Sequence, residues 1–106
     1  MREFYYIACQ IERGAFTNER TFEVPLSANV TYEGSSDGKL VGTAHFDYLR
    51  DKNKKPLGDE EPSYGETIEG FVVCRRIREL GKGFLLVELP SADVIHVAES
   101  SLIQED

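Results

Sequence analysis

The feature that most constrains this chain is a recurring series of short segments rich in β-branched and aromatic residues, separated by clusters of Gly, Pro, Asn and Asp. Segments of this kind, bounded by turn-forming residues, are typical of β-strands. Apolar residues at the 3.6-residue spacing of an amphipathic helix are nearly absent. The pattern therefore predicts an all-β fold of six or seven strands.

The alternation of apolar and polar residues indicates where these strands lie and which side chains they bury. In the first segment we expect Tyr5, Ile7, Cys9 and Ile11 to face inward. The clearest strand is 39–49, in which Leu40, Ala44, Phe46 and Tyr48 form an apolar face. The predicted strands are 4–12, 20–26, 30–32, 39–49, 67–79, 84–89 and 94–98.

The turn signals predict how these strands connect. Gly14 and Asn18 lie between the first two strands, which we expect to form a hairpin, and Pro25 marks a strand end or an edge because it lacks an amide hydrogen. The glycine-rich segment 34–38 predicts a second hairpin between 30–32 and 39–49. The last three strands should form a meander, and 100–103 a single helical turn at an open end of the fold.

A long polar loop occupies residues 50–65, with four lysines or arginines, four acidic residues and two prolines. Loops of this length without secondary structure are uncommon in compact domains, and are either functional or mobile. The sequence leaves both alternatives open.

Length and charge limit the classes of protein to consider. A chain of 106 residues has the size of one domain, so we expect a single β domain spanning 1–106. The longest hydrophobic run is six residues, at 4–9, far short of the roughly 20 that cross a bilayer. The N-terminus lacks the layout of a secretory signal, so we predict a soluble cytoplasmic protein without a membrane span. The net charge of −7 disfavours nucleic acid as a partner.

With short strands, a long loop and no internal repeat, the architecture that we predict is a small half-open antiparallel barrel, since closure limits exposed strand edges. The C-terminal segment 70–103 has a strand, a Gly81-Lys82-Gly83 turn, a strand ending at Pro90, a tight turn, and a strand followed by Glu99-Ser-Ser-Leu102. This segment resembles the meander of SH3-like small barrels. The resemblance covers about a third of the chain, carries no ligand-binding motif, and implies a fold but no proline-rich ligand.

Few residues suggest chemistry at a site. His45 and His96 are isolated and on strand faces that we expect to point outward, so no nucleophile and base pair is recognisable. Cys9 and Cys74 have no close Cys or His partner, which argues against a zinc site. We predict two buried thiols, with a bridge between them left open, and no catalytic residue, metal ligand or cofactor.

The strongest local anomaly is a run of cations, Arg75, Arg76, Arg78 and Lys82, in an otherwise acidic chain. If Phe71, Val73 and Ile77 point inward, Arg75 points inward too, unless a bulge redirects it. One interpretation is that these arginines pair with nearby acidic side chains and cover apolar surface. The other is that they bind an anionic ligand or an acidic partner, with Tyr48 or Tyr64 adding contact area. The predicted binding residues are Arg75, Arg76, Arg78, Tyr48 and Tyr64.

From these observations we expect a non-enzymatic protein-interaction or regulatory module, which binds a protein partner or a second copy of itself. One alternative is a small ligand-binding domain or enzyme with dispersed pocket residues. A further alternative is an acidic mimic of nucleic acid that occupies a basic site on another protein.

Overall fold

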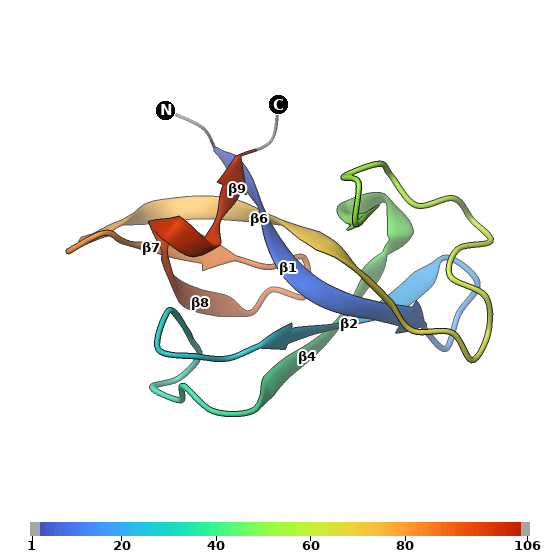
Figure 1. Ribbon diagram of the computed structural model, residues 1–106, viewed down its shortest axis with the longest axis horizontal. Helices are drawn as coiled ribbons and strands as arrows, with labels where there is room; N and C mark the ends of the chain where they lie inside the picture. Colours follow the sequence, from blue (N-terminus) through green and yellow to red (C-terminus); the bar gives the residue numbers. More distant parts are fainter. Residues whose placement is uncertain (1–2, 105–106) are drawn as a thin grey trace.

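The computed structural model describes residues 3–104 and has one antiparallel sheet that curls into a half-barrel (Figure 1). The all-β class and the half-open barrel that the sequence predicts are confirmed. Nine strands are found within these residues, more than predicted because several are only two or three residues long. The longer strands are β1 (Phe4–Arg13), β2 (Glu19–Pro25), β4 (Lys39–His45), β6 (Ile68–Gly81), β7 (Phe84–Glu88) and β8 (Val94–Ala98).

Short elements complete the sheet. The order of the main path is β3-β8-β7-β6-β1-β2-β4, while β5 also pairs with β6 and β9 also pairs with β1. The pairings form a closed circuit: β1 pairs with β2, β2 with β4, and, after the turn from β4 into β5, β5 with β6, which pairs back with β1. This circuit encloses part of the core. The short elements are β3 (Val30–Thr31), β5 (Leu49–Asp51), β9 (Ile103–Gln104) and the 3-10 helices η1 (Phe46–Tyr48) and η2 (Glu99–Ser101).

The core contains the alternating residues that the pattern of β1 predicts, together with alternating residues of β2. Ile11, Phe22 and Val24 have no exposed surface, and Ile7 and Cys9 are also buried. The β1–β2 hairpin forms as expected, with Ile11 opposite Phe22. The predicted meander is present as β6, β7 and β8, and the predicted helical turn near the C-terminus is η2, followed by the partly buried Leu102.

The predicted hairpin between 30–32 and 39–49 is wrong. β3 pairs with β8, placing Val30 opposite Val97, whereas β4 pairs with β2. The glycine-rich turn at 34–38 therefore connects β3 and β4, two strands that do not pair with each other. The long strand predicted at 39–49 is also interrupted, because His45 accepts a hydrogen bond from the amide of Asp47 at 3.0 Å and caps η1.

The faces of β6 are the reverse of those expected. Val72 and Cys74 are buried, so Phe71, Val73 and Arg75 point to the outer face of the sheet. A β-bulge lies further along, between Arg76 and Arg78 in the pairing with β7. Alternation alone could not assign these faces, because both sets contain apolar residues.

The two cysteines are free and buried. In the β1–β6 register Cys74 lies opposite Tyr5, and Cys9 is four positions further along β1. At about 3.3 Å per residue this is roughly 13 Å along the strand, beyond the reach of a disulfide. The bridge that the sequence left open is therefore not formed.

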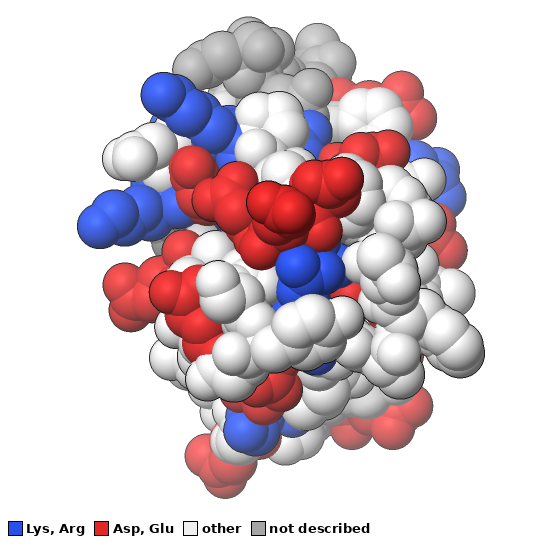
Figure 2. Space-filling model, turned by 90° about the vertical axis from the view of Figure 1, so that its right-hand side faces the viewer, with Lys and Arg blue, Asp and Glu red and all other residues white. Residues whose placement is uncertain are grey.

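The polar loop after β5, residues 52–67, packs against the barrel at one end of the long axis of the molecule. Figure 2 views this end and shows carboxylate side chains gathered on its surface. Leu57 and Pro62 are buried, so the loop is not polar throughout. The guanidinium of Arg20, with no exposed surface, donates hydrogen bonds to backbone carbonyls of the loop at Asp59 (2.9 Å) and Glu61 (2.6 Å). Its remaining bonds go to carbonyls of Thr17 and Glu19.

Neither 3-10 helix is long enough to cross a membrane, and the described residues 3–104 contain no other helix.

Candidate functional site

A cleft with a volume of about 410 Å³ opens on the outer face of the sheet, where β5 and β7 diverge. Both strands pair with the same edge of β6, which places Leu49 opposite Val72 and Glu88 opposite Arg75. Continued by one or two residues, these registers would bring Tyr48 and Pro90 opposite the same residue, Val73. The chain instead turns into η1 at Tyr48, and β7 ends before Pro90, which has no N–H for a sheet hydrogen bond.

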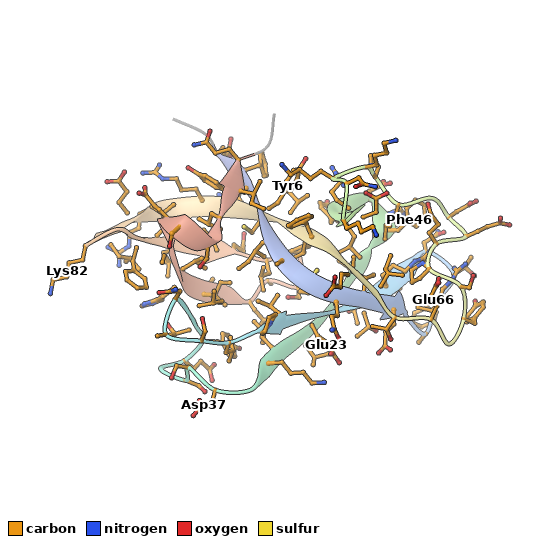
Figure 3. All side chains as sticks on the ribbon, in the orientation of Figure 1. Tyr6, Glu23, Asp37, Phe46, Glu66 and Lys82 are labelled. Carbon is orange, nitrogen blue, oxygen red and sulfur yellow. The ribbon has the colours of Figure 1, made fainter. Side chains whose placement is uncertain are left out.

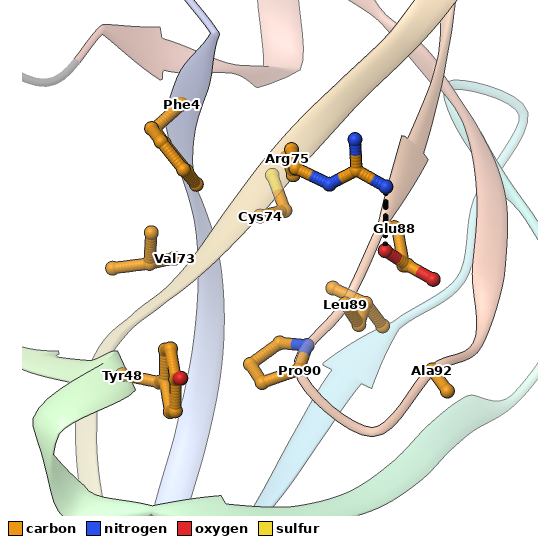
Figure 4. A pocket seen from close by; sticks show the side chains of 9 residues that line it. All are labelled: Phe4, Tyr48, Val73, Cys74, Arg75, Glu88, Leu89, Pro90 and Ala92. Atoms are coloured by element: carbon orange, nitrogen blue, oxygen red, sulfur yellow. Dashed lines mark hydrogen bonds and ion pairs between the residues drawn. The ribbon is translucent and has the colours of Figure 1, made fainter.

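Aromatic and aliphatic side chains form most of the cleft. Figure 4 shows Val73 between Phe4 and Tyr48, with the ring of Pro90 beside Tyr48. Phe4 is 42% exposed and Tyr48 is 52% exposed, and both are large aromatic side chains on the outside of the sheet. The other lining residues are Cys74, Arg75, Glu88, Leu89 and Ala92.

One ion pair lies at the rim. Arg75 donates from Nη2 to Oε1 of Glu88 at 2.9 Å, and both side chains are partly exposed. A guanidinium has five N–H donors, so this single bond leaves most of them available to a ligand. The cleft is thus apolar at its base and polar along one side, as binding sites commonly are.

The cysteine and histidine side chains do not give the cleft a reactive nucleophile. Burial raises the pKa of the Cys74 thiol to about 12, so the sulfur is protonated near neutral pH and a poor nucleophile. His45 and His96 are exposed, as expected, and lie outside the cleft lining. Within residues 3–104 no group of three or more His, Cys, Asp or Glu side chains is placed to hold a metal ion.

The structure brings only some of the predicted binding residues together. Tyr48 and Arg75 share the cleft, and Arg78 points to the same outer face beyond the bulge. Arg76 is half-buried on the opposite side, 3.5 Å from Glu79. Tyr64 lies at the far end of the molecule, where its ring is 4.7 Å from the guanidinium of Arg13.

Several cleft residues escaped prediction from the sequence. Phe4 had a signal, because it alternates with the inward-facing Tyr5 and Ile7 and so belongs to the outer face. Pro90 and Val73 had none, since their meeting depends on two strands that are distant in sequence.

Comparison of the chain with models of protein families, with curated proteins and with solved structures found no match. The assignment of function therefore rests on the geometry of this cleft.

Proposed function

We propose that the protein is a non-enzymatic interaction module, which binds an extended segment of a partner protein in the cleft between β5 and β7. The observation that carries the proposal is the pair of exposed aromatic side chains, Phe4 and Tyr48, on either side of a concave apolar surface. Aromatic and arginine side chains contribute most of the binding energy at protein interfaces, and an apolar anchor in a pocket is a common arrangement.

The shape of the cleft favours a segment over a small molecule. The site is an open depression bounded by a sheet edge and a turn, whereas small-molecule sites enclose most of the ligand surface. A peptide in an extended conformation could follow the edge of β6 where its two neighbours diverge. On this edge of β6, the pairing with β5 ends at Val72 and the pairing with β7 begins at Arg75, so Val73 has no strand partner there.

The experiment is in-cell photo-crosslinking from the cleft. A photoreactive phenylalanine analogue replaces Phe4 or Tyr48, and the matched control replaces Val41, which is 50% exposed on β4. We expect a discrete protein adduct, identified by mass spectrometry, from both cleft positions and not from Val41. Adducts of small-molecule mass would instead support the ligand-binding alternative, and adducts that are equally frequent at Val41 would refute the cleft as the site.

We further propose that the half-barrel is SH3-like. The β6–β7–β8 meander followed by η2 supports this assignment, because it reproduces the order of elements on which the resemblance rests. An experimental structure in which β6, β7 and β8 were not consecutive antiparallel neighbours would overturn it.

The cytoplasm remains the location that we propose. Its support is the pair of free, buried thiols, which suit a reducing compartment. Fractionation of the host cell tests the assignment directly.

A further inference from the structure

We infer that the segment bound in the cleft is acidic, with one apolar anchor beside carboxylates that contact Arg75 and Arg78. This inference rests on the proposed function and specifies the chemistry of the partner. Its basis is the placement of charge on the outer face of β6.

The bulge in β6 sets that placement. Arg76 lies opposite Val87 and Arg78 lies opposite Leu86, so Ile77 is an extra residue without a partner on β7. In a regular strand Arg75 and Arg78 would point to opposite faces, because they are three positions apart. The extra residue returns Arg78 to the outer face, where Arg75 already lies.

Cross-strand pairing then extends two rows of side chains across this face, since directly opposite residues of antiparallel strands share a face. One row runs from Phe4 through Arg75 and Glu88 to Val94. The second runs from Arg78 through Leu86 to His96. Apolar side chains, two arginines, one glutamate and one histidine therefore share the outer face beside the cleft.

Both arginines of this face keep free hydrogen-bonding capacity. Arg75 uses one nitrogen on Glu88, and within residues 3–104 Arg78 forms no ion pair. Arg76 is turned away toward Glu79. Among residues 3–104, the two rows thus carry two guanidinium groups against the single carboxylate of Glu88, which makes this part of the surface locally positive in a chain of net charge −7.

Charge complementarity favours an acidic segment in the cleft. Guanidinium groups pair with carboxylates through two parallel hydrogen bonds, and Arg75 and Arg78 both have donors for this geometry. Basic segments would meet repulsion from the same side chains. An acidic segment can place one apolar side chain between Phe4 and Tyr48 and pair its carboxylates with the arginines beside the cleft.

The test uses three nine-residue peptides, each with one central Phe, flanked on both sides by Glu, Ser or Lys. Each is titrated into the full 106-residue chain at low salt while the backbone amide signals are followed by NMR. We expect the Glu peptide to bind about tenfold more tightly than the Ser peptide, with shifts at Phe4, Val73, Arg75 and Arg78 that weaken in salt. The Lys peptide should bind most weakly.

A matched pair of variants locates the effect. Arg78→Glu should weaken the Glu peptide about tenfold and leave the Ser peptide unchanged. Lys82→Glu makes the same change of charge at the tip of the same hairpin, away from the cleft, and should have little effect (Figure 3). Equal losses in both variants would mean that only overall charge matters, and would overturn the inference.

The remaining outcomes separate the inference from the proposed function. Equal affinity for the Glu and Ser peptides would remove the acidic partner and leave the cleft as an interaction site, whereas no peptide binding at the cleft would count against both. Shifts of the same signals with a short oligothymidylate, and none with the Glu peptide, would identify nucleic acid. Shifts that appear on raising the protein concentration alone would identify a second copy.

Discussion

The Nε of Arg20 lies 2.6 Å from the backbone carbonyl oxygen of Glu61, 41 positions further along the chain. The same guanidinium also reaches the carbonyl of Asp59. These bonds hold the polar loop against β2, and they explain why a segment with so few apolar residues is ordered. Burial lowers the pKa of Arg20, with a further decrease from the charge of Arg13 nearby.

Replacing Arg20 should therefore destabilise the whole protein. The variant Arg20→Met removes every donor from a side chain with no exposed surface and leaves the four carbonyls that it binds without this partner, so we expect the free energy of unfolding in urea to fall by roughly 2 to 4 kcal/mol. The amides of 58–62 should exchange faster. Arg13→Met is the control, because Arg13 is only half-buried and its shortest bond goes to the carbonyl of Pro62. An equal loss in both variants would contradict the role of Arg20.

Gly70 determines how closely β5 can approach β6. A Cβ atom at Gly70 would meet the backbone carbonyl oxygen of Arg50, which cannot move without breaking the pairing of the two strands. We expect Gly70→Ala to lower stability by about 1 to 3 kcal/mol and to displace Tyr48 from the cleft. Gly58→Ala is the control, since its Cβ would come no closer than 3.4 Å to the side chain of Glu61. Thermal unfolding of both variants checks the prediction.

The two buried thiols should make stability depend on pH in the alkaline range. Burial raises the pKa of Cys9 and Cys74 from 9.0 to about 12, so the folded state keeps protons that the unfolded state loses. Their contribution is complete below pH 9 and is lost as the pH rises toward 12. Urea unfolding should show a steeper alkaline decline in the wild type than in the variant with Cys9→Ala and Cys74→Ala. Parallel declines would disprove the assignment.

The same burial predicts slow chemical modification. At pH 8 we expect a thiol reagent to label neither cysteine of the folded protein within minutes, and both after unfolding in urea. Rapid labelling of Cys74 in the folded protein would show that the cleft is deeper and wetter than this structure indicates.

The bulge in β6 implies that one residue of this strand, Ile77, can be deleted without loss of the fold. Removing Ile77 should preserve the fold, because Arg76 and Arg78 would then be consecutive and remain opposite Val87 and Leu86. We expect a change in the free energy of unfolding of only about 1 kcal/mol, and Glu-peptide binding that persists. Deleting Val73, in the regular part of β6, should exchange the faces of every later residue of the strand and abolish cooperative unfolding. A folded Val73 deletion would refute this explanation.

Local alternation was sufficient to predict the longer strands, the all-β class and the inward face of β1. Those predictions succeed because the period of two along a half-buried strand is a property of consecutive residues, such as Tyr5, Ile7 and Cys9. The same argument failed on β6, where Val72 and Val73 are equally apolar and only contact with the core distinguishes them.

Strand pairing and the site depended on tertiary structure. The sequence could not show that β3 joins β8, or that β5 and β7 diverge beside Val73, because these contacts join residues far apart in the chain and no local signal encodes the loop closure between them. The run of arginines was visible in the sequence from the start. Which of them share a face was decided by one extra residue, Ile77, whose effect appears only when β6 is paired with β7.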